Sequence, residues 1–202
     1  MIFEPRRALW LPVLILPLLG PLLGALAVAR ADTPDVDPVT GYRMERYQAA
    51  VPDQPPAGQR VWIEEIDRLV ASERAILLDV SPIHGAGFDP ATGAWRLSKP
   101  HDTLPGAIWL PEVGRGAVDP AIAQWFEREL VRLTGGDKAR AIVIFCHADC
   151  WMSWNAMKRA AGLGYINLKW FPEGTDGWKD FDRKLVPATP LPVSGAADSR
   201  SR

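Results

Sequence analysis

The sequence has few residues of the kinds that form disulfides or bind soft metals. It contains two cysteines and three histidines among 202 residues. Two cysteines cannot make a disulfide framework; they can make one bridge, one redox pair, or a nucleophile and a bystander. The motif Cys-x-x-Cys-His does not occur, so covalent haem attachment is not supported. No internal repeat is visible, and the length suits one domain with appendages.

An excess of positive charge is also lacking. The chain has 23 Lys and Arg residues and 24 Asp and Glu residues. Residues 1–31 hold three arginines and one glutamate, so the rest of the chain has 20 basic and 23 acidic side chains and a net charge of −3. Nucleic-acid binding domains carry basic patches and a positive net charge. We therefore expect no nucleic-acid partner.

Residues 1–31 have the pattern of a signal peptide for export. Arg6 and Arg7 precede the long apolar segment 8–28, and residues 29–31 read Ala-Arg-Ala, a small-x-small pattern that a signal peptidase accepts. The alternative is a retained membrane anchor, since the apolar segment approaches spanning length, although three prolines interrupt it. We predict cleavage, a periplasmic location and no stable membrane span in the mature chain. In such an oxidising space a pair of thiols can be found as a disulfide.

The stretch 142–164, IVIFCHADCWMSWNAMKRAAGLG, contains both cysteines. Its first four residues are apolar and mostly β-branched, which predicts a short strand buried on both faces. Cys146 ends this run, and Cys150 follows four residues later. Apolar residues then recur at helical spacing until Gly162 and Gly164. The pattern therefore predicts a strand, a tight loop and a helix.

A loop of this kind lies at the carboxyl edge of a parallel sheet and at a helix N-terminus, where unpaired amides and the helix dipole favour an anion. The thiolate of Cys146 is placed to be that anion, because such a position lowers a thiol pKa below about 8.5 and the thiolate is the reactive form. The alternative is a buried structural cysteine.

Cys150 has two interpretations. It can resolve a persulfide or sulfenic acid on Cys146 by forming a disulfide, or it can be paired with Cys146 permanently. A static bridge across so short a loop would remove little entropy from the unfolded chain, so stability alone is a poor reason for it.

Other segments alternate between strand and helix patterns. Strands are expected at 61–63, 75–80, 107–110 and 165–171, and helices at 64–71, from Pro120 to Gly135, and after a turn at 172–178. This alternation predicts an α/β fold, a single domain in which a parallel sheet has helices on both faces. The segment 81–104 has no periodicity, and a loop of that length is often functional.

Composition divides the chain into four parts. After the signal peptide, residues 32–59 are rich in proline, acid and small residues, and we expect an extended N-terminal arm over the domain surface. The domain is predicted at 60–186. Residues 187–202 are proline, small and charged residues, which predicts a disordered tail.

Four places in the chain resemble the rhodanese-like domain. They are LLDV at 77–80, LPGAIWLP at 104–111, the strand with its six-residue loop at 142–151, and the spacing through Ala160, Gly164 and the Glu-Gly pair 173–174 to Trp178. Together they span most of 61–185. The segments CHADCWMSWNAMKRA and FPEGTDGW resemble those of a narrower group. These are exported proteins that are associated with PQQ-dependent alcohol catabolism and named for a CXXCW motif. Here the spacing is Cys-x-x-x-Cys-Trp.

The resemblance implies a rhodanese-like fold in which Cys146 carries a persulfide and the loop amides point at its sulfur. Cys150 would be the resolving or disulfide partner, and the remaining loop residues would be His147, Ala148, Asp149 and Trp151. The implied activity is that of a sulfurtransferase or a thiol–disulfide redox protein. No cofactor is required, and PQQ would be met only by association.

The implied partners are a sulfur or thiol substrate and a quinoprotein dehydrogenase or a cytochrome. A second hypothesis is a catalytically silent rhodanese-fold module that binds a cofactor, a metal or a quinoprotein dehydrogenase.

The loop also departs from the family pattern. Many active members have a basic loop that ends in arginine, whereas this loop contains His147 and Asp149 and ends in Trp151. A carboxylate near the sulfur raises the thiol pKa and repels an anionic donor. The family sequence Asp-Val-Arg is Asp-Val-Ser at 79–81, and Thr103 replaces a histidine often found before the Pro-Gly-Ala element. These departures argue against simple transfer of sulfur from thiosulfate to cyanide.

Individual side chains in this region have further interpretations. Asp149 is either the N-cap of the following helix or a residue that tunes the thiols. His147 either steers a thiolate or binds a metal, or it faces solvent. His84 and His101 could complete a metal site only if the loop 81–104 folds over Cys146, and since the spacing fits no zinc pattern we predict no metal.

An aromatic wall for a planar ligand could be formed by the tryptophans at positions 151, 154, 170 and 178. Aromatic residues at this spacing usually belong to a core, however. Trp151, in the loop itself, is the one expected to be exposed.

Overall fold

The computed structural model describes residues 35–84 and 87–193. The predicted signal peptide and residues 194–202 lie outside this part of the chain. Within it, no helix is both long enough and apolar enough to cross a membrane.

Five parallel strands form the main sheet in the order β1-β6-β5-β2-β4. Their bounds are β1 Gln59–Arg60, β2 Ile76–Asp79, β4 Ile108–Trp109, β5 Ile142–Phe145 and β6 Leu168–Phe171. In the register of the three central strands, Phe145 lies opposite Asp79 on one side and Phe171 on the other. The last residues of these strands therefore meet at one edge of the sheet, and Cys146 follows directly at that edge.

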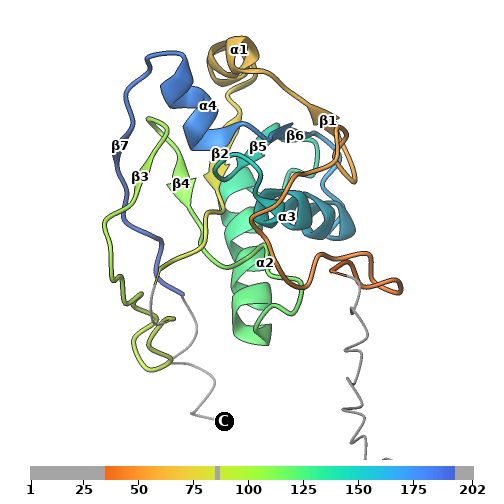
Figure 1. Ribbon diagram of the computed structural model, residues 1–202, viewed down its shortest axis with the longest axis vertical. Coiled ribbons are helices and arrows are strands. Elements are labelled where there is room, and N and C mark those ends of the chain that lie inside the picture. Colours follow the sequence, from red (N-terminus) through yellow and green to blue (C-terminus); the bar gives the residue numbers. More distant parts are fainter. Residues whose placement is uncertain (1–34, 85–86, 194–202) are drawn as a thin grey trace, which may run out of the picture. The chain divides into compact units, whose positions relative to one another are not determined.

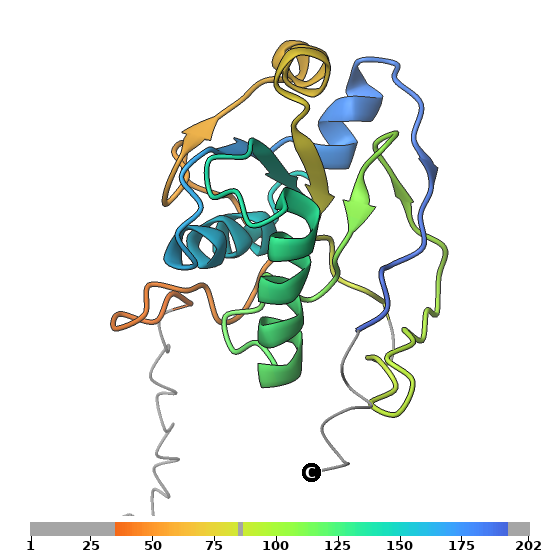
Figure 2. The same ribbon diagram turned by 180° about the vertical axis from the view of Figure 1, so that it is seen from behind.

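In the described part of the chain, four helices cover the two faces of this sheet: α1 Ile63–Glu73, α2 Pro120–Thr134, α3 Trp151–Gly162 and α4 Gly174–Asp180. Successive strand residues point to opposite faces. Leu78 and Ile144 pack with α2 and α3, whereas Leu77 and Val143 pack with α1 and α4. Figures 1 and 2 show the sheet between these two helix pairs. The prediction of an α/β domain with helices on both faces of a parallel sheet is confirmed.

Helix α2 follows the sequence signals closely. Pro120 is its first residue, and the Asp119 carboxylate accepts a hydrogen bond from the amide of Ala121 at 2.8 Å. The helix ends at Thr134, and Gly135 follows with a φ of 66°. Such a cap satisfies backbone groups that the helix leaves unpaired at its ends.

Other boundaries differ from the predictions by a few residues. The predicted strand 61–63 is wrong, since β1 ends at Arg60 and α1 begins at Ile63. The Glu65 carboxylate accepts the amide hydrogen of Trp62 at 3.0 Å, which satisfies that amide just before the helix. The turn predicted at 172–178 contains the start of α4 at Gly174.

A second, smaller sheet was not predicted. Strand β3, Asp102–Thr103, pairs antiparallel with β7, Val186–Pro187, as Figures 1 and 2 show. The chain then stays on the domain up to Val193, whose amide donates to the Gly93 carbonyl at 2.9 Å and whose side chain is buried.

This ordered segment corrects the prediction of a disordered tail for residues 187–193. The segment is proline-rich, but backbone hydrogen bonds to distant parts of the chain and one buried valine hold it. Neither feature is visible in local composition.

Candidate functional site

The two cysteines form a disulfide at the carboxyl edge of the main sheet. Cys146 follows β5, and Cys150 is the residue immediately before α3. Their Cα atoms are 6.3 Å apart, within the range that disulfides adopt. Both side chains are buried, with exposed fractions of 0% and 2%. The predicted strand, loop and helix are confirmed, and they bring the two candidate catalytic residues into a covalent bond.

Asp149 is not the N-cap of α3, so the first of its two interpretations is wrong. An N-cap residue has an extended backbone, whereas Asp149 has a φ of 52° and an exposed side chain. Cys150 takes the N-cap position and makes no side-chain cap bond. Because Asp tolerates the left-handed conformation better than most residues, it suits the tight turn that closes the loop.

Two of the loop amides have acceptors in this state. The amide of Ala148 donates to an Asp176 carboxylate oxygen at 3.1 Å, and the amide of Trp151 donates to the Tyr47 carbonyl at 2.8 Å. These two amides are therefore not free to point at the sulfur, as the family resemblance implies for the loop amides. The Asp176 carboxylate accepts one amide hydrogen that a sulfur anion could otherwise use.

Asp176 was missed as a site residue, although it lies in the quoted motif FPEGTDGW. It is in α4 and forms an ion pair with Lys179 at 2.9 Å. Partial burial raises the pKa of Asp176. Hydrogen bonds from Lys179 and the Ala148 amide, with the charges of Lys179 and His147, outweigh this effect and leave the pKa below its ordinary value. At neutral pH a negative charge therefore borders the cysteine loop.

Gly174 lets α4 approach the loop closely. Its φ is 53°, and a Cβ atom there would lie 2.0 Å from the carbonyl oxygen of Cys146. The next amide, that of Thr175, donates to the same oxygen at 2.9 Å. Any larger residue at position 174 would push α4 away from Cys146, since backbone atoms cannot yield as a flexible side chain can.

The N-terminal arm, which is described from residue 35 onward, covers the cysteine loop with residues 47–50. Gln48 pairs with Cys150 in an isolated antiparallel bridge, and its side-chain amide donates to the Ala148 carbonyl at 3.0 Å. Trp151 donates its indole hydrogen to the Ala50 carbonyl at 3.0 Å and is 8% exposed. The prediction of an exposed Trp151 is therefore wrong, because the ring is covered by the arm.

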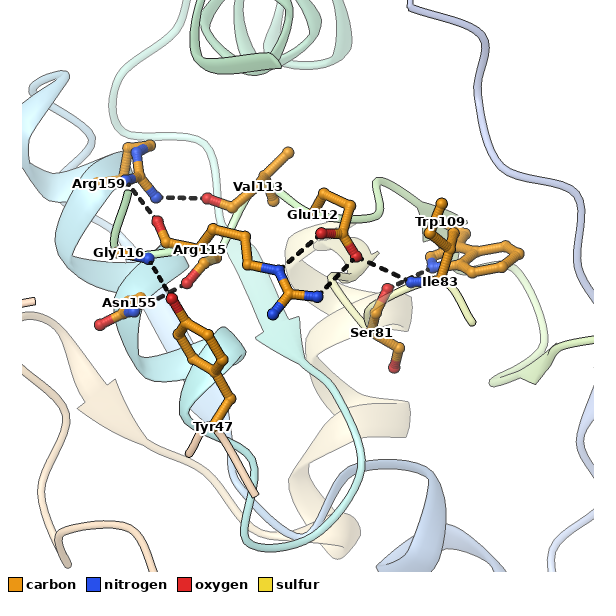
Figure 3. Close-up of polar contacts among 11 residues, drawn as sticks. Tyr47, Ser81, Ile83, Trp109, Glu112, Val113, Arg115, Gly116, Asn155 and Arg159 are labelled. Carbon is orange, nitrogen blue, oxygen red and sulfur yellow. Dashed lines mark hydrogen bonds and ion pairs between the residues drawn. The ribbon is translucent and has the colours of Figure 1, made fainter. Parts of the chain in front are cut away.

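A polar network fixes the arm to the domain (Figure 3). The hydroxyl of Tyr47 accepts the Gly116 amide hydrogen at 2.9 Å, and the guanidinium of Arg115 lies 5.0 Å from the Tyr47 ring centroid. Arg159 donates to the carbonyls of Val113 and Arg115 and so joins this segment to α3. The arm is thus joined through Gly116 and Arg115 to α3.

Asp79 binds two side chains of the irregular segment. Thr103 donates its hydroxyl to one Asp79 carboxylate oxygen at 2.6 Å, and Nε2 of His101 lies 2.7 Å from the same oxygen. The His101 ring also packs on Trp109, with centroids 4.1 Å apart. In the described part of the chain, neither His84 nor His101 belongs to a group of metal-ligating side chains with the cysteines. The condition for the metal site considered for these two histidines is therefore not met.

No protein-family model matches the chain, and no curated protein matches it. Among solved structures, thiosulfate sulfurtransferase from Pseudomonas aeruginosa aligns with 71% of this chain and 24% of its own, at 18% identity and a TM-score of 0.44. Wild-type EanB aligns with 66% of this chain and 32% of its own, at 16% identity and a TM-score of 0.42. An EanB variant with a cysteine persulfide and ergothioneine aligns at 17% identity and a TM-score of 0.43. This chain spans about a quarter to a third of the length of these solved chains.

Proposed function

We propose that this protein is a rhodanese-like domain with a reversible dithiol–disulfide centre that processes sulfane sulfur, with Cys146 as nucleophile and Cys150 as resolving residue. The observation that carries this proposal is the disulfide that closes the loop between β5 and α3. The cysteines are only four residues apart, so the bridge removes little entropy from the unfolded chain and adds little stability. A bridge of this kind at the carboxyl edge of a parallel sheet, where such folds bind ligands, supports a chemical role.

The reaction begins with the reduced protein. The Cys146 thiolate attacks the outer sulfur of an organic persulfide, the sulfur–sulfur bond of the donor breaks, and the donor leaves as a thiol. Cys146 then carries the persulfide. The Cys150 thiolate attacks the inner sulfur, forms the disulfide and releases hydrosulfide. A dithiol partner reduces the bridge by exchange and is itself oxidised to a disulfide.

The charges of the loop favour such a donor over thiosulfate. No Lys or Arg lies between Cys146 and Trp151, and Asp176 holds the amide of Ala148. A dianion would therefore meet a carboxylate and no cation of the loop itself, since Lys179 is already paired with Asp176. Organic persulfides carry at most one charge on the sulfur.

Intact-mass analysis of the reduced protein tests this proposal. With an organic persulfide, we expect Cys150→Ser to keep one added sulfur atom on Cys146, and the wild-type protein to return to the disulfide while it releases hydrosulfide. Cys146→Ser is the control and should gain no sulfur. The proposal fails if Cys150→Ser forms no adduct and the Cys146 thiol alkylates only near the pH of a free cysteine, about 8.5.

Burial favours one other function, that of a catalytically silent module. Both sulfur-bearing side chains are covered, at 0% and 2% exposure, as they would be if the bridge only shaped a binding surface. A module of this kind would keep its partner binding when Cys146 is replaced by serine. The enzyme would lose sulfur turnover in the same variant.

We also propose that the chain is exported and serves a quinoprotein alcohol oxidation system. The signal pattern in residues 1–31 supports export. The sequences of the cysteine loop and of the segment after β6, which resemble the exported group, support the alcohol oxidation system. The mature chain should begin at Asp32 in N-terminal sequencing, and an uncleaved membrane-bound chain would contradict export. Crosslinking to a quinoprotein dehydrogenase or to its cytochrome tests the partner, with Cys146→Ser as the matched variant.

A further inference from the structure

His147 lies beside the cysteine pair and offers a third ligand atom of a soft kind. In the described part of the chain, the two cysteine sulfurs and a ring nitrogen of His147 all lie within 4.8 Å of one another. The cysteines are buried and the histidine is half-buried. We propose that reduction of the disulfide creates a Cu(I) site whose ligands are Cys146, His147 and Cys150.

The surroundings of His147 suit a metal ligand. Its Nδ1 lies 3.1 Å from the carbonyl oxygen of Ala148, and that oxygen also accepts the side-chain amide of Gln48 at 3.0 Å. An imidazole that donates its Nδ1 hydrogen to a carbonyl keeps the Nε2 lone pair for a metal, and metal-binding histidines usually have such a partner. The arm, through Gln48, thus helps to set the histidine tautomer and the position of its ring.

The ligand set selects the metal. Two thiolates and one imidazole are soft ligands that favour Cu(I) or zinc over hard cations. Zinc in a protein takes four ligands, or three and a water. Here Asp149 is exposed, and the Asp176 carboxylate is occupied by Lys179 and by the Ala148 amide. The arm covers the loop, which disfavours a water as fourth ligand, and Cu(I) is stable with three ligands.

The redox state of the cysteines gates this site. In the disulfide each sulfur is bonded to the other, and no thiolate is present. A dithiol donates two electrons and two protons, becomes a disulfide, and leaves Cys146 and Cys150 as thiols. Cu(I) then binds both sulfurs and the imidazole, and the two thiol protons pass to solvent. An organic disulfide reverses the change. It takes two electrons from the two thiolates and two protons from solvent, leaves as two thiols, and the bridge re-forms without the metal.

Competition with a chromogenic Cu(I) chelator under anaerobic conditions tests this inference. We expect the reduced protein to bind one equivalent of Cu(I) and the oxidised protein to bind none. His147→Ala should weaken the Cu(I) affinity at least roughly tenfold, since loss of even an outer partner costs 10 to 100-fold. His84→Ala, which changes an exposed histidine outside the group, is the matched control. X-ray absorption should show two sulfur ligands and one nitrogen ligand.

Equal binding by the reduced and oxidised proteins would overturn the inference, as would a His147→Ala affinity equal to that of the wild type. Cys150→Ser is a second variant, and its unchanged Cu(I) affinity would have the same consequence.

The metal proposal and the sulfur proposal can be contradicted independently of each other. A protein that binds Cu(I) but takes no sulfane sulfur contradicts only the proposed function. A protein that takes sulfur but no Cu(I) contradicts only the metal site.

Discussion

Asp176 limits how well the cysteine loop can stabilise an anion on Cys146. Its carboxylate accepts the Ala148 amide at 3.1 Å and holds Lys179 at 2.9 Å. A persulfide anion on Cys146 would be stabilised by amide donors, as any anion at a helix N-terminus is. With one such donor taken by a carboxylate, the loop disfavours a long-lived anionic persulfide and favours its rapid resolution by Cys150.

Replacement of Asp176 by alanine should therefore stabilise the thiolate form of Cys146. The change removes a negative charge and frees the Ala148 amide, so we expect the pKa of the Cys146 thiol to fall by about one unit, which corresponds to about 1.4 kcal/mol. The rate of alkylation against pH, measured in a Cys150→Ser background, gives this pKa. Asp180→Ala, which removes an exposed acid from the same helix, is the control. An unchanged pH profile would show that Asp176 has no influence on the sulfur.

The charge of Asp176 also gives a pH-dependent stability. The pKa of Asp176 is lower in the folded protein than its ordinary value, so its charge stabilises the fold above about pH 4 and this contribution is lost as the pH falls through the folded pKa. Since the side chain is 43% exposed, screening by solvent limits the effect to about 0.2 to 1 kcal/mol.

Asp176→Asn removes the charge and keeps an acceptor for the Ala148 amide. At pH 7 this variant should have a lower free energy of unfolding than the wild type, and the difference should shrink below pH 4. A loss of equal size at both pH values would mean that the charge is not its cause.

Among the elements, the arm controls access to the disulfide. Three of its residues bind the loop and the first residue of α3 through backbone groups. The Ala49 amide donates to the Asp149 carbonyl, and the carbonyls of Tyr47 and Ala50 accept from the amide and the indole of Trp151. A reductant reaches the buried sulfurs only after these contacts open. The rate of disulfide reduction should therefore follow the stability of the arm.

Trp151→Phe tests this control. It removes the indole donor to the Ala50 carbonyl, a hydrogen bond with a net contribution of about 1 kcal/mol, so reduction by a small dithiol should become about fivefold faster. Trp62→Phe, at an exposed tryptophan before α1, should leave the rate unchanged. Equal rates in both variants and the wild type would show that the arm does not limit access.

The contact between β2 and the β3–β7 sheet depends on Asp79. This fully buried carboxylate accepts from the Ser81 amide, the Thr103 hydroxyl and His101. Asp79→Ala would leave the amide and the hydroxyl buried without partners, each at a cost of about 1 to 3 kcal/mol. We expect a loss of about 3 kcal/mol or more in urea unfolding, a size known for broken buried pairs. The neighbouring exposed Asp102→Ala is the control, and a loss below about 1 kcal/mol in Asp79→Ala would contradict the assignment.

Across the whole molecule, local pattern was enough for β2, β4, β5 and β6 of the main sheet and for the cysteine loop, but not for β1. The apolar run 142–145, the spacing after Cys150 and the start at Pro120 each depend on neighbours along the chain, and each was predicted correctly. Contacts that join distant segments were not predictable in this way. Gln48 meets Cys150 and Asp176 meets Ala148 only once the arm and α4 are placed, and the buried Trp151 and the ordered segment 187–193 follow from the same placement.

The central claim is that the bond between Cys146 and Cys150 is a working redox couple in an otherwise unchanged fold. Equilibration of the protein in dithiol–disulfide buffers, followed by alkylation and intact-mass analysis, measures its reduction potential. We predict a single two-electron transition between about −120 and −270 mV, the range of thiol redox proteins, with both thiols alkylated together and the circular dichroism of the fold retained. A bridge that stays closed below about −300 mV, as structural disulfides do, or that opens only when the protein unfolds, would contradict the account.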